Sequence, residues 1–238
     1  MAQQMFARKL TRSIVVGAAA IAIAGGSYGI ISATSSSGSA AASSGFAGGL
    51  GSGGRGSNAR SGPAAGGAAG TVASVSGSSF TLSTSAGQKV TVDEASSTTY
   101  QNGTSPALAA AVATGEPVLV VGTTSGTTIT ATQVVVQPAN VGGSATSAAA
   151  KVIPFQRGAP TTSKQVGQIP ATFSQGSGTI VSGTAAAKAT EAALAAYPGG
   201  IVDRVVGLSN GEYNVHYIGV NWPHHVFVNQ DFKVIGAE

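Results

Sequence analysis

The sequence contains no cysteine and very little charge. Without cysteine the chain has no disulfide bonds, no thiolate metal ligands and no cysteine nucleophile. Asp, Glu, Lys and Arg make up 8% of the 238 residues, whereas about 25% is usual for soluble domains. This shortage argues against an ordinary cytosolic enzyme, and the length allows one or two domains.

The sequence also lacks a basic stripe. The net charge is +4, but Arg8, Lys9 and Arg12 precede the first apolar run, and without them 9 basic residues face 8 acidic ones. Proteins that bind nucleic acids gather Lys and Arg on one face or along one helix. We therefore expect no nucleic-acid partner.

Residues 13–33 form an uncharged apolar segment close to the start of the chain. At about 1.5 Å per residue, a helix of this length nearly spans the hydrocarbon core of a bilayer. The basic flank, residues 1–12, places the amino terminus in the cytoplasm and the rest of the chain outside. We expect a transmembrane anchor that crosses the cell membrane once, with the carboxy-terminal part extracellular. The alternative is a signal peptide cut near Ala24 or Ala33, which would release a secreted protein.

Two further segments have the composition of linkers. Residues 34–69 consist mostly of Gly, Ser and Ala, which bury too little apolar surface to offset the entropic cost of ordering. Residues 139–178 carry three prolines among Ser, Thr, Gly and Gln, and predict a second, stiffer disordered linker. The sequence thus predicts two separate folded units in a monomeric ectodomain.

The first predicted unit spans residues 70–138 and contains short β-branched runs separated by glycine. This pattern predicts an all-β fold, a small antiparallel barrel. The unit resembles a bacterial exported domain of unknown function through Gly70-Thr71-Val72, Phe80-Thr81-Leu82 and Gly115-Glu116-Pro117-Val118. That resemblance implies an architecture and no activity.

The second predicted unit spans residues 179–238 and has an α+β pattern. Apolar residues recur at helical spacing from Thr184 to Tyr197, and Pro198-Gly199-Gly200 ends the helix. Ser209-Asn210-Gly211-Glu212 predicts a hairpin turn between two strands, and two more strands follow. We expect one helix on one face of an antiparallel sheet, with the other face uncovered.

This second unit resembles the PepSY domain, a helix-plus-sheet module of exported proteins. The resemblance rests on Tyr197-Pro198-Gly199-Gly200, Val202-Asp203-Arg204-Val205, Gly211-Glu212-Tyr213-Asn214-Val215-His216 and the ending Val226-Phe227-Val228. It implies a non-catalytic module for peptide or peptidase binding and inhibition. Where the family has a short acidic turn, this chain has Asn221-Trp222-Pro223-His224-His225.

The candidate binding residues lie around the predicted open face and edge of this sheet. Aromatic residues are enriched in binding hot spots, so their clustering favours an interaction surface here. We expect these residues to bind a peptide or peptidase: Tyr213, Tyr217, Trp222, His224 and His225. We expect no catalytic residue and no cofactor.

Two alternatives are of other classes. A metal-dependent hydrolase would use His216, His224 and His225 as zinc ligands. Adjacent residues of a strand point to opposite faces, so His224 and His225 should diverge, and we expect no metal site. The second alternative is an envelope structural or adhesive protein, which the low charge and the long spacers favour.

Overall fold

The computed structural model describes residues 62–137 and 152–238. All of them belong to one compact unit, Leu50–Glu238. The predicted membrane segment 13–33 and its flank 1–12 lie outside the described residues. Within the described ranges, no helix combines the length and apolar character needed to cross a membrane.

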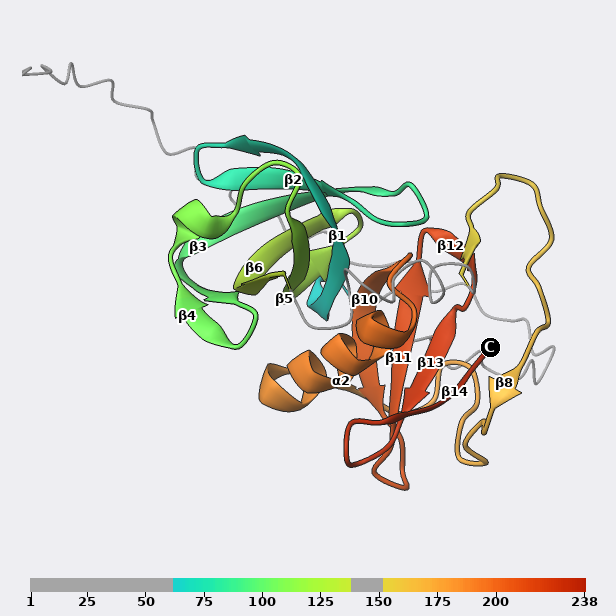
Figure 1. Ribbon diagram of the computed structural model, residues 1–238. Coiled ribbons are helices and arrows are strands. Elements are labelled where there is room, and N and C mark those ends of the chain that lie inside the picture. Colours follow the sequence, from blue (N-terminus) through green and yellow to red (C-terminus); the bar gives the residue numbers. More distant parts are fainter. Residues whose placement is uncertain (1–61, 138–151) are drawn as a thin grey trace, which may run out of the picture. The chain divides into compact units, whose positions relative to one another are not determined.

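The described residues are mostly β-strand, with a single α-helix, which confirms the coarse prediction of a β-rich fold with one helix (Figure 1). A short 3-10 helix, Ala109–Ala111, stands between β4 and β5. The elements are β1 (Ala64–Ser76), β2 (Ser79–Ser83), β3 (Lys89–Asn102), β4 (Ser105–Ala107), β5 (Pro117–Ser125), β6 (Thr128–Val136), β7 (Ile153–Pro154), β8 (Val166–Gly167), β9 (Thr179–Val181), α2 (Gly183–Ala196), β10 (Ile201–Gly207), β11 (Tyr213–Ile218), β12 (Val220–Trp222), β13 (His225–Val228) and β14 (Val234–Ala237).

The prediction that the β-rich unit stands apart from the α+β unit is wrong, because the two share a sheet. One 12-stranded sheet runs in the order β2-β3-β6-β5-β1-β10-β11-β13-β14-β8, with a further pairing between β2 and β1. Strands β3 and β6 pair in parallel, whereas we expected antiparallel pairs throughout. Strand β1 carries the sheet from one predicted unit into the other, because Gly67 and Ala68 pair with Val202 and Ile201 of β10.

The start of β1 lies within the predicted linker 34–69, so that prediction is wrong for residues 64–69. Gly66 and Gly67 permit this pairing because they have no side chain. A Cβ at Gly66 would lie 2.0 Å from the Val202 carbonyl oxygen, and one at Gly67 would lie 2.2 Å from the Val120 carbonyl oxygen. The glycines that made this segment look like a linker therefore allow the backbones of β1, β5 and β10 to approach closely.

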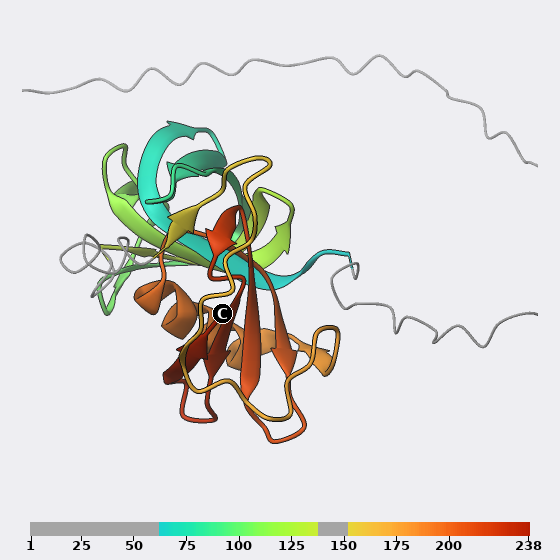
Figure 2. The same ribbon diagram turned by 90° about the vertical axis from the view of Figure 1, so that its right-hand side faces the viewer.

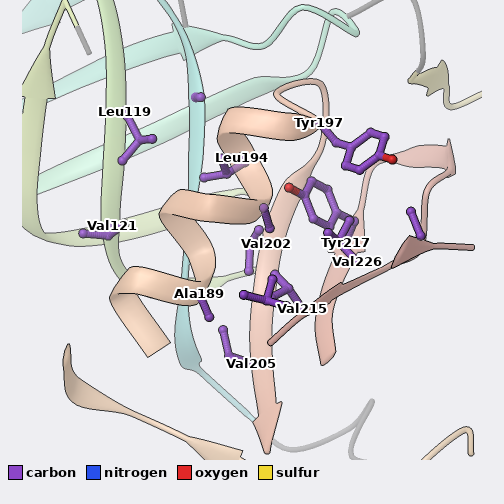
Figure 3. Close-up of a cluster of buried hydrophobic side chains, with 14 of the residues drawn as sticks. Leu119, Val121, Ala189, Leu194, Tyr197, Val202, Val205, Val215, Tyr217 and Val226 are labelled. Carbon is purple, nitrogen blue, oxygen red and sulfur yellow. The ribbon is translucent and has the colours of Figure 1, made fainter. Parts of the chain in front are cut away.

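Helix α2 packs on the strands of the α+β half, as predicted, and it also contacts β1 and β5 of the other half, which was not predicted. Its buried residues are Ala186, Ala189, Thr190, Ala193 and Leu194. Figure 3 shows Ala189 and Leu194 between Leu119 and Val121 of β5 on one side and Val202, Val205 and Val215 on the other. A second buried cluster, which includes Phe80, Leu82 and Ile129, fills the space enclosed by β1, β2, β3, β5 and β6.

The prediction of a disordered linker over 139–178 is wrong for the described part, residues 152–178. Val152 is buried, β7 pairs with β12, and β8 pairs with β14. Figures 1 and 2 show this segment, coloured yellow, which begins at β7 beside β12 and continues to β8. Phe173 from the same segment packs on Phe227, with ring centroids 4.8 Å apart, so the sheet face predicted to be uncovered is covered here.

Candidate functional site

A cavity of about 500 Å³ lies between the sheet and residues 161–178, which we call the strap. The lining is polar and carries every histidine of the chain. It consists of Thr161, Thr162, Ser163, Gln165, Phe173, Gln175, His216, His224, His225 and Glu238. A larger hollow of about 700 Å³ at the start of α2 has only uncharged lining residues, so the histidine cavity is the stronger candidate.

Strands β10 and β11 place an ion cluster at the base of the cavity. Asp203 Oδ1 lies 2.6 Å from His216 Nδ1, and Asp203 Oδ2 lies 3.0 Å from Arg204 Nη1. The Arg204 Nη2 atom is also 2.7 Å from His216 Nδ1. A carboxylate only accepts hydrogen bonds and a guanidinium only donates them, so the Nδ1 atom of His216 donates to Asp203 in one tautomer and accepts from Arg204 in the other. Arg204 also bridges the two groups, because its Nη1 atom contacts Asp203 and its Nη2 atom contacts His216.

His225 is held in a similar way by the neighbouring strand. Its Nδ1 atom lies 3.0 Å from Asn214 Oδ1, an amide oxygen that can only accept, so His225 carries its proton on Nδ1. Its ring meets the His216 ring edge-on, at 5.0 Å between centroids, and the Phe173 ring at 5.1 Å. The pair of imidazoles is therefore fixed from below by the sheet and from above by the strap.

The environment keeps two of the imidazoles neutral. Burial lowers the pKa of His225 from 6.5 to about 3, with His216, His224 and Arg204 adding to this effect and Asp203 opposing it. Burial and His216 also lower the pKa of His224, while a hydrogen bond to the Tyr217 backbone partly opposes them. At neutral pH His224 and His225 thus offer the cavity imidazole acceptors without positive charge.

One hydroxyl in the lining has an unused hydrogen-bonding capacity. Thr162 Oγ1 is buried and has no hydrogen-bond partner among the described residues. Most buried polar atoms in proteins have a partner, because leaving one unsatisfied costs about 1 to 3 kcal/mol. This hydroxyl is a donor and an acceptor that a ligand in the cavity would satisfy.

The structure separates the five predicted binding residues. His224 and His225 line the cavity, as a binding role requires. Tyr217 is 0% exposed and Trp222 is 1% exposed, and neither lines the cavity. Tyr213 is partly exposed and stacks on Phe232, 5.6 Å between centroids, away from the cavity.

The expected divergence of His224 and His225 does not occur. Strand β13 begins at His225, so His224 precedes the strand, and both residues line one cavity with His216. Even so, the described residues contain no group of three His, Cys, Asp or Glu side chains arranged to hold a metal ion. Six of the lining residues come from the predicted linker, where no periodic pattern singles them out: Thr161, Thr162, Ser163, Gln165, Phe173 and Gln175.

Comparison with protein-family models, curated proteins and solved structures gives no match for this chain. The resemblance to the PepSY domain therefore stays a prediction. Its bearing on function depends on the geometry of the cavity.

Proposed function

We propose that the chain is an exported, membrane-tethered binding protein without catalytic activity, which holds a peptide or a segment of a peptidase in the histidine cavity. The apolar segment 13–33 with its basic flank supports export and tethering. The likeness of residues 179–238 to the PepSY domain supports peptide or peptidase binding. Cleavage of the apolar segment would make the same protein a secreted one.

The unsatisfied hydroxyl of Thr162 carries this proposal. It lies in a cavity that also offers the amides of Gln165 and Gln175 and the imidazoles of the histidines. A peptide backbone presents N–H donors and C=O acceptors at short intervals, which is the complement of such a lining. Phe173 supplies an apolar surface for a side chain of the ligand.

The experiment measures binding of a fluorescent library of twelve-residue peptides to the full-length chain by anisotropy. The test variant combines Thr162→Val with Gln175→Ala, which removes hydrogen-bonding groups from the cavity while Val keeps the shape of Thr. We expect it to bind the selected peptides about tenfold more weakly, as for the loss of one or two hydrogen bonds.

The matched control is Thr71→Val, the same change at an exposed position of β1. We expect this control to bind like the unaltered chain. Equal binding by the cavity variant and the control, or no peptide selected from the library, would overturn the proposal.

A further inference from the structure

The strap already binds the sheet as an extended peptide would. Strand β8 adds to the outer edge of β14 in antiparallel orientation, with Val166 opposite Ala237 and Gly167 opposite Gly236. The Gln168 N–H then donates to the Ile235 carbonyl oxygen at 2.8 Å. This is strand addition to a sheet edge, a mode in which backbone hydrogen bonds give affinity and side chains give specificity.

Two side chains that precede β8 make specific contacts with residues outside the strap. The Lys164 ammonium lies over the Trp222 ring, 4.6 Å from its centroid, and the Lys164 carbonyl accepts a 2.7 Å hydrogen bond from Trp222 Nε1. The Gln165 amide donates to Glu238 Oε2 at 3.1 Å. A cation on an indole face and a donor on a carboxylate are both specific contacts.

The residue opposite Gly236 has to be glycine. Gly167 has φ +73°, a conformation that costs other residues about 1 to 2 kcal/mol. In addition, a Cβ at this position would lie 2.2 Å from the Ile235 carbonyl oxygen. The edge of β14 thus selects lysine and glycine three positions apart.

Strand β8 covers only part of the β14 edge. Strand β8 has two residues, whereas β14 has four, and Val166 remains 42% exposed. None of the groups that contact β8 belongs to the strap: Glu238 directly follows β14, and Trp222 lies in β12, which pairs with β7. The same contacts are available to an extended segment of another protein that carries the same spacing.

We propose that the β14 edge is a docking site for an extended partner peptide with the sequence pattern Lys-x-x-Gly, which replaces β8. The inference goes beyond the proposed function, because it concerns the β14 edge and not the histidine cavity. The lysine of the partner lies over Trp222, and its glycine lies opposite Gly236. The strap occupies the site until such a segment displaces it.

The probe is a fluorescent synthetic peptide with the sequence of residues 160–171, added to the full-length chain and followed by anisotropy. We expect saturable binding. Replacing the peptide's glycine, equivalent to Gly167→Ala, should weaken binding about tenfold. The equivalent of Lys164→Ala should weaken it about threefold, the size of one exposed cation–π contact. The equivalent of Gln168→Ala keeps the backbone donor and should bind like the parent peptide.

A reversible crosslink tests whether the strap competes for the edge. The chain has no cysteine, so the only disulfide that can form within one molecule of the double variant Val166→Cys, Ala237→Cys joins the two paired positions. We expect the oxidised protein to lose binding of the probe and the same protein to regain it on reduction. The reduced form is the control for folding, because it carries the same two substitutions.

The outcomes separate this inference from the proposed function. Probe binding that survives the crosslink, or that ignores the Gly167→Ala change, overturns strand replacement at β14. Absence of probe binding to the unaltered and the reduced protein overturns it as well. If library peptides still bind in a manner sensitive to Thr162→Val with Gln175→Ala, the proposed function stands and only the strand-replacement inference fails.

Discussion

The Trp222 indole donates a 2.7 Å hydrogen bond to the carbonyl oxygen of Lys164, 58 positions earlier in the chain. Trp222 is 1% exposed and meets Tyr197 edge-on, with ring centroids 5.5 Å apart. One core side chain therefore holds the strap while it packs against the end of α2. The segment that carries the chain's only tryptophan thus fixes the strap while the strap occupies the β14 edge.

Trp222→Phe should destabilise the protein. The change keeps an aromatic ring but removes the donor to Lys164 and leaves a small cavity. We expect the free energy of unfolding, measured by urea denaturation, to fall by about 2 to 4 kcal/mol. Phe155→Leu, at a position 56% exposed, is the control and should change it by less than about 0.5 kcal/mol. A similar loss in both variants would contradict a core role for Trp222.

Gly67→Ala should disrupt the junction between the two halves of the sheet. The added methyl group would lie 2.2 Å from the Val120 carbonyl oxygen, so β1 would have to shift away from β5. We expect a loss of about 2 to 3 kcal/mol in the free energy of unfolding, as for overpacking in a core. Ser74→Ala, at an exposed position of the same strand, should have little effect. An unchanged denaturation midpoint for Gly67→Ala would show that β1 is not pinned there.

The sequence predicted the elements whose signals are local. The helical spacing between Thr184 and Tyr197 gave α2, and Asn210-Gly211 gave the turn between β10 and β11, because both depend on residues close together in the chain. Composition misled us at Gly66 and Gly67. Glycine that reads as flexible in a linker is also the residue that a close backbone approach requires, and only the partner strand decides which applies.

The candidate site was predicted in part for the same reason. Histidines at 224 and 225 were singled out by their chemistry, and they do line the cavity. Thr162 and Phe173 were missed, because their place over the sheet depends on contacts with residues more than 50 positions away. Tyr217 was misplaced because alternation along a strand identifies two faces but does not say which of them the helix covers.

Stability should fall in acid because of the histidine cavity. Burial lowers the pKa of His225 from its usual 6.5 to about 3 in the folded protein. Between these two pH values the unfolded chain binds a proton that the folded protein does not. The free energy of unfolding therefore increases as pH rises through this window and decreases as pH falls. We expect the urea midpoint to drop steadily from pH 7 to pH 4.

The charged and titratable groups around His225 are Asp203, Arg204, His216, His224 and Glu238. His225→Gln replaces the imidazole by a neutral amide that still donates to Asn214. The variant should show a shallower decline between pH 6.5 and pH 4 than the unaltered chain. An identical slope in the two proteins would mean that another group causes the acid sensitivity.

Tyr217→Phe should leave the protein as stable as before or make it more stable by up to about 1 kcal/mol, which is unusual for a change at a fully buried residue. The Tyr217 hydroxyl has no hydrogen-bond partner among the described residues, and the nearby ring of Tyr197 does not provide one (Figure 3). Burial, and to a lesser extent Tyr197, raises the pKa of Tyr217 well above its usual value, so the hydroxyl stays neutral. No hydrogen bond within the described residues offsets the cost of removing this hydroxyl from water.

The ring of Tyr217 has a different role from its hydroxyl. A Cβ at Gly200 would lie 2.3 Å from Tyr217 Cδ1, so the ring fills the space beside that glycine. Tyr217→Ala should therefore cost about 3 to 5 kcal/mol, as for other buried aromatic residues, while Tyr217→Phe keeps the packing. Thermal and urea unfolding of the two variants measure the difference. A loss above about 1 kcal/mol for Tyr217→Phe would show that the hydroxyl has a partner, such as a buried water.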